Sequence, residues 1–337
     1  MKELNCAVCQ NKSSNKVFVA REMNFGLRDR FEYFECASCG CVQIKGTPAD
    51  LSRYYPPQYY AGAIDKERQG PLKRFLKHQR AKHCLYGGNM LGMFLARRYG
   101  RPVAEIFGKP DHYTWLKRCN LDFASDILDV GCNSGNLLLS MSEDGFSNLT
   151  GIDPFIEKNI DYKPGLRILK ADVRQMDGQF DFVMLHHTFE HMEEPLAAMK
   201  QFYRLLKHDR FLLIRTPVAS SFSYRKYGAN WVQLDAPRHL FVHTVRSIHL
   251  LGANSGFQVV GAAFDSTEFQ FWGSEQYVVD IPLRDPRSYA VDPRNSMFSK
   301  EQITAFRQQA EQLNRSNDGD SACFYLYKAS SSGVVDP

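Results

Sequence analysis

Three histidines and a glutamate stand within six residues, in the segment HHTFEH that begins at His186. A histidine whose pKa lies near neutrality can take a proton from a hydroxyl or an amine, so this segment could supply a general base. We expect His187 to be that base. Alternatively, Glu190 and His191 cap the helix that follows them. The HExxH pattern of zinc proteases is absent, and a divalent metal held by this segment is a further alternative.

A second group of chemically capable side chains lies in the segment NWVQLDAPRHLFVHT, at residues 230–244. Arg238 could hold a phosphate or a carboxylate, His239 could act as a base, and Asp235 could orient it. Alternatively, the segment is a loop that leads into the cap of the next helix. We therefore predict three catalytic residues, which are His187, His239 and Arg238.

Four cysteines form two pairs near the N-terminus, Cys6-x2-Cys9 and Cys36-x2-Cys39. Each Cys-x2-Cys turn directs two thiolates at one point, and two such turns complete a tetrahedral site suited to zinc. The alternative is two coincidental pairs. The spacing predicts a structural zinc ribbon, whose metal would supply folding energy because the first 45 residues contain little apolar material. The odd total of nine cysteines and the absence of a signal peptide favour a reducing compartment, so we expect a cytoplasmic protein.

A glycine turn follows the apolar run DILDV at residues 126–130. Gly131 and Gly135 bracket this turn around Asn133, and Asp129 and Asp153 stand at the ends of two successive apolar runs. An acid at the end of a second strand can accept hydrogen bonds from both hydroxyls of a ribose. The glycine spacing does not match GxGxxG, which disfavours a nicotinamide enzyme, and no phosphate-binding GK[ST] sequence follows.

Apolar runs alternate with helical patterns from residue 126 to residue 265, and one more run covers residues 322–329. This alternation predicts an α/β fold with a doubly wound, mostly parallel, seven-stranded sheet. Ligands of such sheets bind beyond the carboxyl ends of the strands, where the glycine turn and the histidine segment would lie. The predicted parts are a zinc ribbon (residues 1–50), a linker with a helical region (51–120) and a cofactor-binding domain (121–330). Within the last of these, residues 266–298 are predicted to form an irregular insertion.

The segments LDVGCNSGNLL, GIDP, ADVRQM and FDFVMLHHTFEHMEEP resemble the Rossmann-like class I methyltransferases that use S-adenosylmethionine. The resemblance implies that the glycine turn contacts the methionine moiety of this cofactor, that Asp153 binds its ribose and that Asp172 contacts its adenine. The cofactor's sulfonium already carries an activated methyl group, so the protein has to position an acceptor and remove a proton. The predicted cofactor-binding residues are Asp129, Gly131, Asn133, Gly135, Asp153, Asp172 and His186.

The ribbon and the methyltransferase core together resemble bacterial methyltransferases of sugar nucleotides or surface polysaccharides. The resemblance implies O-methylation of a sugar hydroxyl in polysaccharide biosynthesis, with a nucleotide sugar as the small-molecule acceptor. C- or N-methylation of a sugar or another metabolite is an alternative, and two other classes stay open: an RNA-modifying methyltransferase and a non-catalytic cofactor-binding module. A formal net charge of +5 over 337 residues disfavours nucleic acid as a partner, and no apolar window predicts a membrane span.

Overall fold

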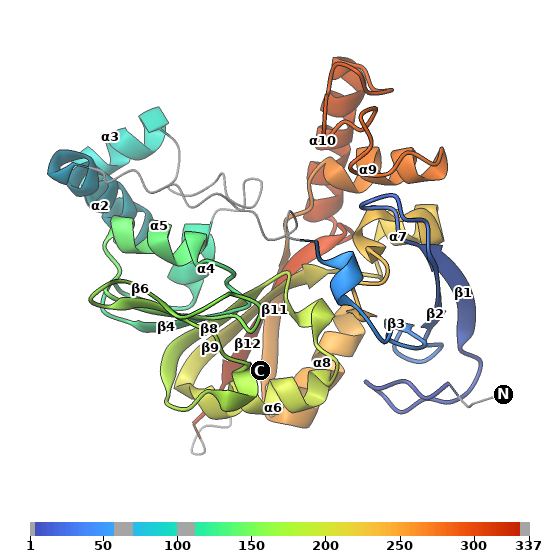
Figure 1. Ribbon diagram of the computed structural model, residues 1–337. Coiled ribbons are helices and arrows are strands. Elements are labelled where there is room, and N and C mark those ends of the chain that lie inside the picture. The colour runs from blue at the N-terminus through green and yellow to red at the C-terminus, as the bar shows by residue number, and fades with distance from the viewer. Residues whose placement is uncertain (1–3, 57–69, 100–111, 331–337) are drawn as a thin grey trace. The chain divides into compact units, whose positions relative to one another are not determined.

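The computed structural model describes residues 4–56, 70–99 and 112–330 of the chain (Figure 1). Contacts within the chain group its residues into two compact units. Of the described residues, the first unit comprises 4–56, 187–199 and 214–326, and the second comprises 70–99, 112–186, 200–213 and 327–330. None of the helices in the described ranges is long and apolar enough to span a membrane. The predicted boundaries at residues 50 and 120 stay predictions.

The second unit contains the glycine turn within a parallel sheet. Its parallel strands are β4 (Asp126–Val130), β5 (Asn148–Ile152), β7 (Leu166–Leu169) and β8 (Phe180–His186). A short strand, β6 (Ile160–Lys163), pairs antiparallel with β7. The helices are α2 (Pro71–Tyr86), α3 (Met90–Tyr99), α4 (His112–Arg118) and α5 (Asn136–Asp144), with a 3-10 turn η2 (Val173–Gln175). Residues 57–69 and 100–111 of the predicted linker and helical region lie outside the described residues.

Strand β4 lies between β8 and β5, with Asp129 opposite Met184 on one side and Gly151 on the other. The last four residues of β4 and of β5 are buried, as expected for strands covered on both faces. Because these strands are parallel, their carboxyl ends meet at one edge of the sheet. This edge carries the glycine turn after β4, Asp153 after β5 and His186 at the end of β8.

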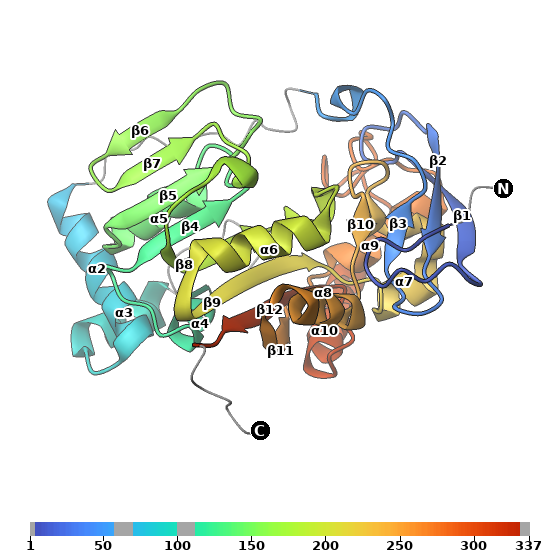
Figure 2. The same cartoon turned by 90° about the horizontal axis from the view of Figure 1, so that it is seen from below.

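Hydrogen bonds join eight described strands in the order β11-β12-β9-β8-β4-β5-β7-β6. The remaining members are β9 (Leu206–Pro217), β11 (Gln258–Phe264) and β12 (Ser321–Lys328). Figure 2 shows β4, β5, β7 and β6 side by side. The predicted α/β fold with a mostly parallel sheet is confirmed. The sheet has eight strands instead of the predicted seven because β6, whose side chains are half-buried or exposed, folds back along β7.

The first unit contains a second, antiparallel sheet with the strand order β1-β2-β3-β10. Its strands are β1 (Lys16–Arg21), β2 (Arg30–Glu35), β3 (Val42–Ile44) and β10 (Phe241–Val242). Helices α7 (Phe222–Tyr227), α8 (Val245–Ser255), α9 (Phe269–Val278) and α10 (Lys300–Arg315) belong to the same unit, and α6 (Pro195–Leu205) begins there. The 3-10 turns are η1 (Ser52–Tyr54), η3 (Phe189–His191), η4 (Gly228–Asn230) and η5 (Val232–Leu234). Strand β10 thus adds a distant segment to the predicted ribbon.

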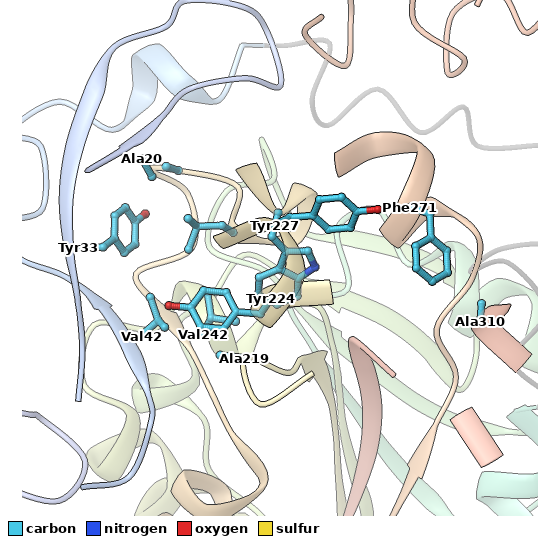
Figure 3. Packing of buried hydrophobic residues seen from close by; sticks show 12 residues of the cluster. Ala20, Tyr33, Val42, Ala219, Tyr224, Tyr227, Val242, Phe271 and Ala310 are labelled. Atoms are coloured by element: carbon cyan, nitrogen blue, oxygen red, sulfur yellow. The ribbon is translucent and has the colours of Figure 1, made fainter. Parts of the chain in front are cut away.

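A hydrophobic cluster joins the ribbon sheet to the rest of the first unit (Figure 3). Tyr33 and Val42 of the ribbon are fully buried in it, together with Trp231 and Phe271. Burying a large apolar side chain contributes roughly 1.5–3 kcal/mol. The first 45 residues therefore share a core with later segments, and a metal is not the sole source of their folding energy.

The segment predicted as an irregular insertion, 266–298, contains helix α9. Seven of its ten residues are buried, among them Phe271, Trp272 and Tyr277. Buried residues surround this helix on several sides, so it lacks the one-sided apolar pattern by which a surface helix is recognised in a sequence. Residues 279–298 form neither a helix nor a strand.

Candidate functional site

The glycine turn connects β4 to α5 through three residues with left-handed backbone angles. The φ angles are 74° at Gly131, 52° at Asn133 and 83° at Gly135. A Cβ atom at residue 135 would lie 2.5 Å from Cδ1 of Ile168, so this position requires glycine for space as well as for conformation. The N–H of Gly131 donates to the carbonyl of Ile152 over 2.8 Å and ties the turn to the end of β5. Asparagine tolerates left-handed angles better than most residues, which explains how it replaces a third glycine.

Asp153 holds the same turn from the next strand. Its Oδ2 accepts a hydrogen bond from the N–H of Asn133 over 2.9 Å, and its Oδ1 accepts one from the N–H of Phe155 over 2.8 Å. Each carboxylate oxygen has a second lone pair, with which it can accept a hydroxyl of a ligand. Asp129 is buried, and its pKa is raised well above the usual value by burial and by the charge of Asp153. A cationic or hydrogen-bond-donating ligand would stabilise the charged form of Asp129.

Two further predicted cofactor residues lie at the same edge of the sheet. His186 ends β8 one position beyond Leu185, which is opposite Val130, and its ring packs on Trp115 with the ring centroids 4.7 Å apart. Asp172 follows β7 and caps η2, where Arg174 donates to it from the backbone and from the guanidinium group. The hydrogen bond from the Arg174 side chain lowers the pKa of Asp172. The contact of Asp172 with adenine stays a prediction.

A cluster of histidines surrounds Glu190 in the first unit. The Glu190 side chain is fully buried, and its Oε2 accepts a hydrogen bond from Thr216 Oγ1 over 3.1 Å. Its Oε1 lies 3.3 Å from Nδ1 of His187 and 3.9 Å from Nε2 of His239. Burial by itself would raise the pKa of Glu190, but His187 and the other neighbouring histidines bring it to about 2. Glu190 is therefore an anion at neutral pH.

His187 has a left-handed φ of 50° and a side chain that is 30% exposed. Arg215 donates a hydrogen bond from Nη1 to Nε2 of His187, and its Nε lies 2.5 Å from Oδ2 of Asp265. Because an arginine can only donate, Nε2 is the acceptor and the proton of the neutral ring lies on Nδ1, towards Glu190. A substrate hydroxyl must replace Arg215 at Nε2 before His187 can take its proton. Arg215 is not among the predicted site residues, although it is a lone arginine in the apolar run FLLIRTP.

His191 and His239 each direct Nδ1 at a backbone carbonyl. The distances are 2.8 Å from His191 to the carbonyl of Arg238 and 2.8 Å from His239 to the carbonyl of Gln233. A carbonyl only accepts, so Nδ1 donates in both rings and Nε2 keeps the lone pair of a neutral imidazole. Burial and the nearby His191 lower the pKa of His239 to about 4, so His239 is neutral at pH 7.

Arg238 occupies a buried ion-pair network. Its side chain is fully buried and binds Asp235 through Nε and Nη2, over 2.9 and 2.7 Å. The same guanidinium group donates to Glu22 over 2.8 Å and to the carbonyl of Tyr54 over 3.0 Å. The predicted binding of an anionic acceptor by Arg238 stays untested. The structure places Arg238 where it holds the ribbon and residues 235–239 together.

The four paired cysteines converge in the first unit. Their sulfur atoms lie within 4.8 Å of one another, with 3.6 Å between Cys6 and Cys39 and 3.5 Å between Cys9 and Cys36. Zinc–sulfur bonds of about 2.3 Å in a tetrahedron place the sulfurs about 3.8 Å apart, so this arrangement is compatible with zinc. The two turns repeat one geometry, because Gln10 and Gly40 have φ angles of 63° and 71° and donate to the carbonyls of Cys6 and Cys36.

The parallel sheet, the left-handed turn after its β4 strand and the acid after β5 define a Rossmann-like protein with a site for a nucleoside-containing ligand. A family model described as a methyltransferase domain matches residues 92–262, which is half of the chain. The chain therefore belongs to this methyltransferase family, and the predicted methyltransferase core is confirmed.

Individual relatives match shorter stretches. The chain is 28% identical over 123 residues to a trans-aconitate 2-methyltransferase of Enterobacter sp. (strain 638), covering 35% of this chain and 45% of that protein. It is 27% identical over 154 residues to a ubiquinone biosynthesis O-methyltransferase of Erwinia tasmaniensis, covering 41% and 61%. The chain thus spans about half the length of the curated relatives it matches. The structure of the cyclopropane synthase MmaA2 from Mycobacterium tuberculosis is similar at 17% identity and a TM-score of 0.41, over 63% of this chain and 81% of that chain.

Proposed function

We propose that this chain transfers a methyl group from S-adenosylmethionine to a hydroxyl of a sugar nucleotide or of a surface-polysaccharide sugar. The observation that carries the cofactor assignment is the glycine turn held by Asp153, in a chain that belongs to a methyltransferase family. The sugar acceptor is supported by the resemblance of the ribbon and the core to sugar-modifying methyltransferases. Oxygen as the accepting atom is also in keeping with the relative whose name specifies an O-methyltransferase.

The chain's own residues bind the cofactor and remove a proton. When bound, S-adenosylmethionine would supply the electrophilic methyl group for an in-line displacement by the acceptor oxygen, with S-adenosylhomocysteine as the leaving group. Gly131 and Gly135 leave room for the methionine moiety, and Asp153 accepts the ribose hydroxyls. Asp129, Asn133, Asp172 and His186 complete the proposed cofactor-binding set.

His187 is the proposed proton acceptor because its side chain is 30% exposed, whereas that of the alternative base, His239, is buried. The acceptor hydroxyl takes the place of Arg215 at Nε2, while Arg215 keeps its ion pair with Asp265. The hydroxyl proton passes to Nε2 as the new carbon–oxygen bond forms, and the charge of Glu190 near Nδ1 stabilises the resulting imidazolium. His239 is the alternative base, since its Nε2 also carries a lone pair.

Calorimetric titration with S-adenosylmethionine tests the cofactor assignment. We expect micromolar binding, about −8 kcal/mol, by the wild type and a loss of at least tenfold in Asp153→Ala. Asp177→Ala is the matched control because Asp177 belongs to the same unit and its side chain is 88% exposed. Equal affinity in Asp153→Ala and the wild type would contradict the proposed ribose contact.

Methyl transfer to a panel of nucleotide sugars tests the acceptor and the base. His187→Ala should lower kcat at least a hundredfold, as general-base loss does, whereas the exposed His249→Ala should retain activity. Equal activity in His187→Ala and the wild type would contradict the assignment of the base to His187.

We also propose that Cys6, Cys9, Cys36 and Cys39 hold a structural zinc ion. All four positions of a tetrahedral zinc ion would be filled by thiolates, which leaves none for substrate. The amide of Gln43 donates to the sulfur of Cys6 over 2.9 Å and would orient that ligand. Metal analysis of Cys36→Ser should show one zinc fewer per chain than the wild type.

A further inference from the structure

Glu190 has a fully buried carboxyl group whose two oxygens are unequally satisfied. One carboxylate oxygen, Oε2, receives the hydrogen bond from Thr216, whereas Oε1 has no hydrogen-bond partner among the described residues. The nearest donor, Nδ1 of His187 at 3.3 Å, makes no well-aligned hydrogen bond with it. Leaving one oxygen of a buried carboxylate without a partner costs several kcal/mol unless a cation or a donor approaches it.

Two imidazole rings face this carboxyl group. One nitrogen of His191, one nitrogen of His239 and a carboxylate oxygen of Glu190 all lie within 4.8 Å of one another. The two rings lie 4.8 Å apart at an angle of 69°, so they converge from different directions. Both rings donate from Nδ1 to backbone carbonyls, which is the outer contact that metal-bound histidines usually make, and both therefore keep Nε2 for a metal.

We propose that Glu190, His191 and His239 bind a divalent transition-metal ion through Oε1 and the two Nε2 atoms. Two imidazoles and one carboxylate suit zinc, manganese or iron, whereas the thiolates of the four-cysteine site select zinc. Metal–ligand bonds of about 2.1 Å require donors about 3–3.5 Å apart, so His239 Nε2 and Glu190 Oε1, which are 3.9 Å apart, need to approach each other only slightly. The ion supplies the positive charge that Oε1 lacks.

Three protein ligands leave coordination positions open, as in catalytic metal sites and unlike structural ones. On the proposed function, these positions take oxygen atoms of the sugar acceptor and polarise its hydroxyl. His187 is not one of the three ligands, so its Nε2 stays available to take the proton, whereas Oε1 of Glu190 then binds the ion and no longer stabilises the imidazolium by itself. The metal site itself is independent of the methyl-transfer assignment, because it is defined by the histidine cluster alone.

Zinc stoichiometry tests the site without cofactor or acceptor. The full-length wild type, His191→Asn and His239→Asn are dialysed against a small excess of zinc chloride. The zinc bound per chain is then measured by inductively coupled plasma mass spectrometry. Asparagine is chosen because its amide nitrogen can replace Nδ1 as a donor to the backbone carbonyl but offers no ring nitrogen to a metal. His249→Asn is the control, because His249 is an exposed histidine on α8.

We expect each ligand variant to hold one zinc fewer than the wild type and His249→Asn to hold the same number. Circular dichroism of each metal-free variant checks that it is folded, and Glu190→Gln repeats the test with the third ligand. Equal zinc content in the wild type and in folded His191→Asn and His239→Asn would overturn the proposal. If the wild type methylates none of the sugar acceptors while each ligand variant still holds one zinc fewer than the wild type, the proposed function is refuted and the proposed metal site is supported.

Discussion

Replacing Arg238 by methionine should destabilise the first unit more than it affects acceptor binding. Methionine fills a similar volume but cannot donate a hydrogen bond, so the substitution leaves Asp235 and Glu22 without their cation. Glu22 keeps two hydrogen bonds from the backbone N–H groups of Phe25 and Leu27, whereas Asp235 loses its bidentate partner. Most of the lost free energy of unfolding should therefore come from the uncompensated charge of the Asp235 carboxylate.

The size of the effect follows from burial. The guanidinium group is fully buried, and removing one partner of a buried ion pair costs about 3–5 kcal/mol because the remaining charge has lost its compensation. The control is Arg294→Met, whose guanidinium is 92% exposed and pairs with Asp292 at 3.3 Å. An exposed pair of this kind contributes about 0–1 kcal/mol. Adding Asp235→Asn to Arg238→Met should recover part of the lost stability, because it removes the uncompensated carboxylate charge.

Urea unfolding followed by tryptophan fluorescence measures both variants, since Trp231 is buried in the first unit. The KM for the best acceptor is measured in parallel. If Arg238→Met unfolds within about 1 kcal/mol of the wild type while the KM for the acceptor rises tenfold or more, the structural role is refuted and the sequence-based assignment to acceptor binding is supported.

Three further outcomes are expected. Gly135→Ala should lower the free energy of unfolding by about 1–3 kcal/mol and weaken S-adenosylmethionine binding. The control is Gly178→Ala, which should cost less because Gly178 has a φ of 101° but open space around it. Equal losses of thermal stability in the two variants would contradict this. Burial raises the pKa of Asp320 to about 6, so the folded chain favours the protonated carboxyl group. The contribution of this group to the free energy of unfolding is therefore fully present below about pH 4 and is lost as the pH rises through 6. Asp320→Asn should therefore gain about 2–3 kcal/mol relative to the wild type between pH 4 and pH 7 in urea unfolding, and a difference that does not change with pH would refute the assignment. Removing zinc with a chelator should lower the unfolding temperature, but β1 to β3 should not unfold on their own because they share a core with Trp231. Loss of hydrogen-exchange protection only at the backbone amides of β1 to β3 would contradict this.

Most of the strands and the two cysteine turns could be predicted because their signals are local. An apolar run of four to seven residues, a glycine with a left-handed φ and a Cys-x2-Cys spacing each depend on neighbours a few residues away. Helix α9 was missed for the opposite reason, since it is stabilised by contacts with η5 and α7. Strand β6 was missed because its half-exposed residues carry little apolar signal.

The sequence by itself determined the α/β class, the glycine turn with Asp153, and the four-cysteine site, because spacing along the chain places those atoms together. Only the tertiary structure decided which histidines meet Glu190. His191 and His239 are far apart in the sequence, and their approach depends on how residues 235–239 pack against η3, which no periodicity reports. The same packing buried Arg238 and turned it from an expected ligand-binding cation into the centre of an ion-pair network.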